Sequence, residues 1–143
     1  MKRLRMAVII VLSLVFALSS CDLWYGIFGD PIVGTWVLTA ETVNGTAFTI
    51  GTGATDMSMT LDIAKDGTIT GGGAFGPSPF TTTGTWTRSG TTYTLIATST
   101  SGGSGTYTGT ATYTGTVSSD GKTFTGSVSG AGITSGSATL AKQ

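Results

Sequence analysis

The residue with the most distinctive chemistry in this sequence is its single cysteine, Cys21. Leu18, Ser19 and Ser20 stand directly before it, so one aliphatic and two small residues lead to the thiol. Small side chains let an extended backbone enter a peptidase site, and a thiol is a nucleophile that accepts acyl and other lipid groups. The spacing therefore predicts cleavage after Ser20 and attachment of lipid, palmitate included, at Cys21.

The residues before this cysteine have the composition of an export signal. Three of the first five residues are cationic, and an apolar run from 7 to 18 follows, interrupted only by Ser13. A helix that spans a bilayer needs about 20 apolar residues, so this run is typical of the apolar core of a signal peptide. Together with the cysteine, the pattern resembles the bacterial lipobox.

These features predict three parts of the chain. Residues 1–20 are expected to be a lipoprotein signal peptide, residues 21–31 a lipidated tether, and residues 32–143 one domain. We expect the protein to be exported to the cell envelope and held on a membrane by its lipid. The sequence leaves open whether that membrane is the inner or the outer one.

The remaining residue types exclude most catalytic and metal sites. The chain has no histidine and no second cysteine, so it lacks a Ser-His-Asp triad and a multi-cysteine metal site. Asp62 and Asp66 do not continue into the acidic pattern of a calcium loop, and Asp66 fits a turn better. The spacing favours no pair of catalytic carboxylates. We therefore expect no enzyme, no catalytic residue, no metal and no cofactor.

The charge of the mature chain argues against one class of partner. Residues 21–143 contain four basic and seven acidic residues, a net charge of −3. Nucleic-acid binding depends on clustered cations, and none occur here. Nucleic acid is thus not an expected partner, and the composition does not decide the oligomeric state.

Apolar and polar residues alternate along most of the domain, which indicates half-buried β-strands. In the first strand this alternation places Trp36, Leu38 and Ala40 on one face. Residues 75–79 and 99–105 are predicted loops. The strand candidates are 32–42, 46–50, 57–63, a strand beginning at 68–70, 80–88, 91–98, 106–117, 122–129 and 133–141.

The segment 106–117 is the most regular of these strands. Threonine fills every even position from 106 to 116, and the odd positions alternate large and small side chains. Threonine suits a solvated sheet face, and large-small alternation suits the interior of a small barrel. Tight turns such as Asn44-Gly45 and Asp66-Gly67 join successive strands. The predicted fold is all-β, an antiparallel up-and-down meander of eight or nine strands closing into a barrel.

Gly34-Thr35-Trp36, at the start of this meander, resembles the opening Gly-x-Trp signature of the lipocalin and calycin group. With the lipobox, the layout is similar to short bacterial lipocalin-like domains. A second Gly-Thr-Trp at 84–86 and the Asp-Gly turns support the resemblance, which covers roughly residues 32–140. The family's usual disulfide is absent. Avidin-like barrels share an early Gly-Thr-Trp, but they line their pocket with several tryptophans and are ranked lower.

The resemblance implies a lipocalin-like barrel with a role for particular residues. Trp36 would be the barrel-closing residue, packing across the closed end, and Lys142 is the late basic residue that would lie over it. The Gly-Thr-Trp meander, with methionine and tyrosine on its inward faces, favours a ligand inside the barrel. The leading expectation is thus a membrane-anchored module that binds a small hydrophobic ligand.

The residues expected to line such a pocket are apolar or aromatic and fall on inward faces. An equal alternative is that they fill a solid core, which would make the protein a structural or surface-interaction lipoprotein with no ligand. Arg88 could pair with a ligand carboxylate, but a solvated strand-end arginine is the better interpretation. The candidate lining residues are Met57, Met59, Trp86, Tyr93, Tyr107 and Tyr113.

Overall fold

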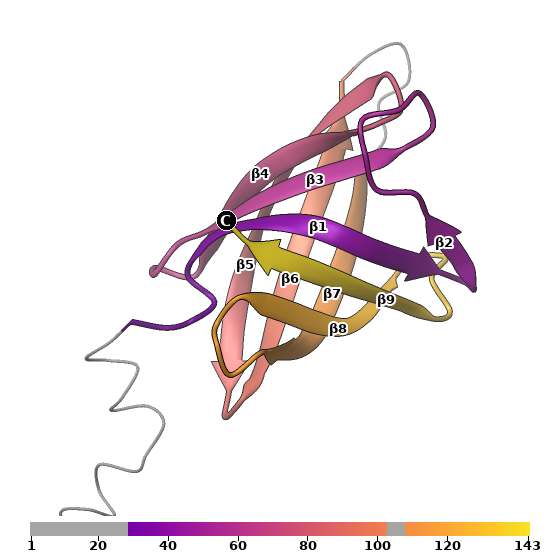
Figure 1. The fold of residues 1–143 in the computed structure, drawn as a ribbon. Helices are drawn as coiled ribbons and strands as arrows, with labels where there is room; N and C mark the ends of the chain where they lie inside the picture. Colours follow the sequence, from indigo (N-terminus) through magenta and orange to yellow (C-terminus); the bar gives the residue numbers. More distant parts are fainter. Residues whose placement is uncertain (1–28, 103–107) are drawn as a thin grey trace, which may run out of the picture. The chain divides into compact units, whose positions relative to one another are not determined.

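The computed structural model of the chain describes residues 29–102 and 108–143, and its barrel unit begins at Ile32. Residues 29–31 belong to the preceding unit. Both described ranges lack helices, and so contain none long and apolar enough to cross a membrane. The strands in Figure 1 are β1 (Gly34–Val43), β2 (Thr46–Phe48), β3 (Met57–Ile63), β4 (Thr68–Phe75), β5 (Ser78–Ser89), β6 (Thr92–Ser101), β7 (Thr108–Val117), β8 (Thr123–Gly130) and β9 (Gly136–Lys142).

The strands form one antiparallel meander that closes on itself. From β3 to β9 each strand pairs with the next in sequence, and β1 pairs with both β3 and β9 (Figure 1). Eight strands, β1 and β3–β9, therefore make a closed barrel, while β2 pairs only with the end of β1. Closure leaves no long unpaired sheet edge. The predicted all-β, antiparallel, closed meander is confirmed.

Because neighbouring strands run in opposite directions, the barrel has two distinct ends. The end where β1 begins and β9 finishes, near Trp36, is called the closed end here. The opposite end, where β1 finishes at Val43, is called the mouth. Turns at 64–67, 90–91 and 118–122 lie at the closed end, and turns at 44–45, 76–77 and 131–135 lie at the mouth.

Side-chain size changes along the barrel interior. From the closed end to the middle, the interior holds large apolar side chains with no exposed surface, which are Trp36, Leu38, Leu61, Leu95, Phe124 and Leu140. Toward the mouth the inward positions become small, as at Ala97, Ala111 and Ala138. Protein interiors are normally close-packed, so small side chains at one end leave space there.

A β-bulge in β1 changes which residues of this strand face inward. Leu38 pairs with Leu140 and Ala40 pairs with Thr139, so Thr39 is an extra residue between them. The extra residue reverses the alternation, and the following inward position is Glu41. The prediction that Ala40 shares a face with Trp36 and Leu38 is wrong, since Ala40 is exposed.

The predicted loop at 75–79 is also shorter than expected, and of the predicted loop at 99–105 only residues 99–102 are described. Residues 75–79 contain only a tight turn at Gly76-Pro77, because β4 and β5 pair as far as Phe75 with Ser78. Pro79 is tolerated within β5 because pairing with β6 begins one residue later, at Phe80. On the other side β6 continues to Ser101. Because these strands are longer than predicted, the barrel wall extends further at the mouth.

Candidate functional site

The mouth of the barrel contains a largely apolar pocket. Its volume is about 490 Å³, large enough for a small organic molecule. The lining consists of Glu41, Val43, Phe48, Met57, Phe75, Ser78, Phe80, Ser99 and Ser101. We call this the mouth pocket.

A second hollow of about 800 Å³ adjoins it toward β7 and the turn before β9. Val43 and Ser99 border both spaces, so the two share a wall. The second hollow is lined by a larger share of polar surface than the first. Its other lining residues are Ala97, Thr108, Gly109, Thr110, Ala111, Tyr113, Ala131, Gly132 and Ile133.

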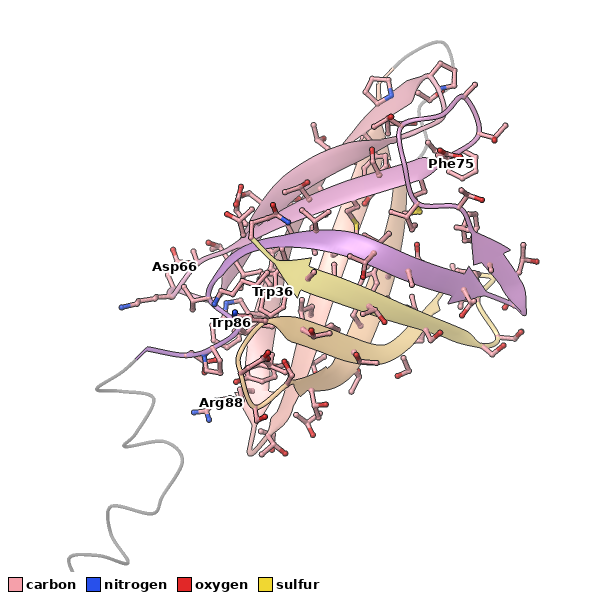
Figure 2. All side chains as sticks on the ribbon, viewed as in Figure 1. Trp36, Asp66, Phe75, Trp86 and Arg88 are labelled. Atoms are coloured by element: carbon pink, nitrogen blue, oxygen red, sulfur yellow. The ribbon has the colours of Figure 1, made fainter. Side chains whose placement is uncertain are left out.

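Aromatic rings form much of the mouth pocket's wall. Phe48 and Phe75 meet edge to face, with their ring centroids 5.9 Å apart, and Phe75 remains 49% exposed. Phe80 lies opposite Gly73 in the β4–β5 pairing, and a Cβ on Gly73 would come within 2.9 Å of the Phe80 ring. The absence of a side chain on Gly73 therefore leaves room for the tip of the ring against β4. Figure 2 shows Phe75 at the mouth, far from Trp36, Trp86 and Arg88.

The bulge at Thr39 points one carboxyl group into this apolar region. Glu41 is only 6% exposed, and its carboxylate accepts a hydrogen bond from the hydroxyl of Tyr113 on β7. Burial raises the pKa of Glu41, although the hydrogen bond from Tyr113 opposes the shift. Burial and the nearby carboxylate also raise the pKa of Tyr113, which therefore stays neutral.

The other buried polar side chain at this end is satisfied in a similar way. The hydroxyl groups of Thr82 and Ser99 lie 2.9 Å apart and share a hydrogen bond. Throughout the described residues, every buried side-chain nitrogen or oxygen has a partner. These buried polar groups are thus fixed by neighbours, which orients them before any ligand arrives.

Asn44 links two of the turns that surround the mouth through hydrogen bonds of its side chain. With Gly45 it forms a tight hairpin turn in which both residues have positive φ, 52° and 79°. Its side-chain amide donates to the carbonyl oxygen of Gly132 at 2.8 Å. Its side-chain oxygen accepts from the backbone N–H of Thr134 at 2.7 Å. The β1–β2 and β8–β9 turns are therefore held together.

The predicted lining residues do not all come together at the mouth. Met57 lines the mouth pocket and Tyr113 lines the second hollow, whereas Met59 and Tyr93 are buried in the core. Tyr107 lies outside the described residues, as does the lipidation candidate Cys21. Trp86, the sixth residue, belongs to the other end of the barrel.

The closed end contains both tryptophans of the barrel. The ring centroids of Trp86 and Tyr93 are 6.2 Å apart, and the indole N–H of Trp86 donates to the carbonyl oxygen of Ala64 at 2.7 Å. Trp36 is fully buried, and its indole N–H donates to the carbonyl oxygen of Ile32 at 2.6 Å. The Nζ of Lys142 lies 5.4 Å from the centroid of the Trp36 ring. The structure thus places Trp36 and Lys142 together at this end.

The charged residues weighed earlier have ordinary local partners. Arg88 donates to the carbonyl oxygen of Gly90 at 3.4 Å, beside a turn of the closed end. Asp62 accepts from the hydroxyl of Thr35 at 2.6 Å, and Asp66 accepts from the backbone N–H of Thr68 at 3.0 Å. In the part of the chain that the structure describes, no group of three His, Cys, Asp or Glu side chains could hold a metal ion.

Of the mouth pocket's lining, sequence reasoning predicted only Met57; it missed the other lining residues, among them the three phenylalanines and the carboxyl group of Glu41. Strict alternation from Trp36 and Leu38 places Glu41 on the outer face. The available signal was a change of phase, since the inward apolar residues are even-numbered at 36 and 38 but odd-numbered at Val43. Such a shift indicates a bulge between them.

Comparison of the chain with protein-family models, with curated proteins and with solved structures found no significant match. The barrel, its apolar mouth and the buried Glu41–Tyr113 pair are therefore the basis for a functional assignment.

Proposed function

We propose that this protein is a lipid-anchored bacterial lipoprotein with a lipocalin-like barrel that binds a small, largely apolar molecule at its mouth. The observation that carries the proposal is the mouth pocket of about 490 Å³, walled by aromatic rings and reached by one buried carboxyl group. Ligand sites in proteins are mostly apolar with a few fixed polar groups. The lipobox at 18–21 and the Gly34-x-Trp36 opening support the lipoprotein and lipocalin-like parts of the proposal.

A binding role fits this pocket better than a catalytic one. Among the described lining residues Glu41 is the one carboxylate, and its partner Tyr113 is held neutral. General acid–base catalysis of hydrolysis generally uses a second carboxylate or an imidazole close by. The proposed protein is therefore a carrier or sensor of its ligand, exposed to the cell envelope and without a cofactor or nucleic-acid partner.

The direct test is equilibrium binding of a neutral apolar dye, Nile red, to the chain beginning at Asp22. An external dye is needed because Trp36 and Trp86 lie at the closed end and do not report on the mouth. We expect saturable binding with a rise in dye emission. Val43 borders both hollows, so Val43→Phe should narrow them and weaken binding about tenfold.

The matched control enlarges a similar side chain outside the barrel. Ile96 is 45% exposed on the outer face of β6, and Ile96→Phe should leave dye binding unchanged. Circular dichroism establishes that both variants keep their β-structure. Equal binding by the two variants, or no saturable binding by the wild type, would refute a pocket at the mouth.

A second candidate function is a structural or surface-interaction lipoprotein without a ligand. One observation favours it: threonines lie opposite one another on the outer face, as in the pairs Thr94–Thr114 and Thr98–Thr110. The hydroxyls of the latter pair are 2.9 Å apart. This candidate predicts that wild type, Val43→Phe and Ile96→Phe all fail to bind Nile red.

A further inference from the structure

The mouth pocket contains one acidic side chain, Glu41, and no basic side chain among its described lining residues. Apart from Glu41, its described lining consists of five apolar side chains and three serines. The group that faces Glu41 from β7 is Tyr113, a neutral hydrogen-bond donor. The opposite position on β9 is Ala138. No described lining residue of the pocket is a cation, so nothing there can neutralise an ionised Glu41.

A carboxylate in these surroundings discriminates between ligand head groups. Removing an ionised carboxyl group from water costs free energy unless an opposite charge approaches it. A ligand ammonium group supplies that charge and forms a charge-assisted hydrogen bond. A ligand carboxylate adds a second negative charge to the same low-dielectric space and is repelled. The rings of Phe48, Phe75 and Phe80 add a further attraction for a cation.

We propose that the mouth pocket selects compact apolar ligands that carry a protonated amine, and that it rejects ligands of the same size that carry a carboxylate. The inference rests on the proposed binding function and names the class of ligand. Glu41 is its specificity-determining residue. Fatty acids, with an apolar chain and an anionic head, are thereby disfavoured.

Three water-soluble probes distinguish the effect of head-group charge on binding from the effect of apolar contact. Phenethylamine, 2-phenylethanol and 3-phenylpropionate share a phenyl ring and a two-carbon spacer but carry positive, zero and negative charge at pH 8. The experiment is isothermal titration calorimetry on the full-length chain in a nonionic detergent. The amine should bind about tenfold or more tightly than the alcohol, and the carboxylate more weakly than either.

Glu41→Gln removes the charge and keeps both the size of the side chain and an acceptor for Tyr113. In this variant the amine should bind no better than the alcohol. The affinity for the carboxylate should rise toward the affinities for the other two probes. The matched control is Asp62→Asn, which makes the same change of net charge at an exposed position of β3. Its ratio of amine to alcohol affinity should equal that of the wild type.

The wild type provides a second measurement that needs no variant. Below the raised pKa of Glu41 the carboxyl group is neutral, so the preference for the amine over the alcohol should disappear as pH falls from 8 to 4. A constant ratio across this range, or an unchanged ratio in Glu41→Gln, overturns the inference. If the alcohol binds but the amine has no advantage, the binding function stands and the ligand class is wrong. If none of the three probes binds, the ligand class is wrong, and Nile red binding by the wild type decides whether the binding function stands.

Discussion

Lys142 and Trp36 face each other across the seam where the last strand of the barrel meets the first. They are direct partners in the β1–β9 pairing, and the Nζ of Lys142 lies 5.4 Å from the centroid of the indole ring. Trp36 is fully buried beneath it. The contact joins residues separated by nearly the whole domain, and it lies where the barrel closes.

Gly34 makes this contact sterically feasible. A Cβ at position 34 would lie 2.7 Å from the Cε of Lys142, and the backbone of Gly34 has a φ of +137°. Only glycine adopts that conformation without strain and leaves room for the lysine stem. Gly34 and Trp36 thus act together with Lys142 at the closed end.

Truncating the tryptophan should strongly destabilise the barrel. Trp36→Ala removes a fully buried ring and leaves a cavity, with an expected cost of about 3–5 kcal/mol in the free energy of unfolding. Lys142→Met keeps most of the apolar stem and removes only the cation, at about 0.5–1 kcal/mol. Urea unfolding followed by circular dichroism measures both. Similar costs for the two variants would show that the ring does not dominate the closed end.

The coupling between Gly34 and Lys142 can be measured separately. Gly34→Ala should cost about 1–3 kcal/mol, from backbone strain together with displacement of the lysine. In a Lys142→Ala background the displacement contributes nothing, so the same substitution should cost less. A double-mutant cycle of unfolding free energies gives the difference, and strictly additive costs would contradict the steric contact.

Stability should depend on pH in opposite directions for two carboxylates. Burial raises the pKa of Glu41 in the folded state, so its contribution is full below pH 4.5 and is lost as pH rises through the raised value. Glu41→Gln should therefore be more stable than the wild type at pH 8, and this advantage should disappear toward pH 4. Unfolding midpoints in urea across this range provide the measurement.

Asp120 serves as the internal contrast. Hydrogen bonds from Ser118 and from the backbone of Lys122 lower the pKa of this exposed carboxyl group. Its contribution is present above pH 3.8 and is lost as pH falls through the lowered value. Asp120→Asn should thus be less stable than the wild type at pH 8 and converge with it in acid. If both variants were more stable than the wild type at pH 8, or both less stable, one of the two carboxyl groups would not lie in the surroundings described.

Membrane attachment should depend on one thiol. Cys21 is the only cysteine, so Cys21→Ser removes the sole acceptor for lipid. Stable anchoring needs two or more lipid chains or an equivalent second signal, and the variant should be released or remain unprocessed. Metabolic labelling with a fatty-acid analogue measures the modification. Equal labelling of wild type and Cys21→Ser would exclude lipidation at this residue.

The strand pattern and the closed meander could be predicted because they depend on local alternation and on turn residues. Asn44-Gly45 and the buried faces of β6 and β8 follow from those rules. The mouth pocket could not be predicted to the same extent. It depends on an extra residue at Thr39, which pairing with β9 reveals and the sequence indicates only as a change of phase. Whether Met59 and Tyr93 face a pocket or a core is set by how large the opposing side chains are, which requires the register of all eight strands.

The bulge predicts that two alanines differ in how much their enlargement costs. Uninterrupted alternation would place both of them inside the barrel. Ala40 follows the extra residue and is exposed, whereas Ala138, the partner of Glu41 on β9, is 2% exposed. Ala40→Leu should change the unfolding free energy by less than about 0.5 kcal/mol, as for other surface substitutions. Ala138→Leu should cost about 1–3 kcal/mol because it overpacks the interior beside Glu41. If Ala40→Leu were as costly as Ala138→Leu, Ala40 would face inward, the alternation would run unbroken through β1, and the Glu41 carboxyl group would lie outside the barrel.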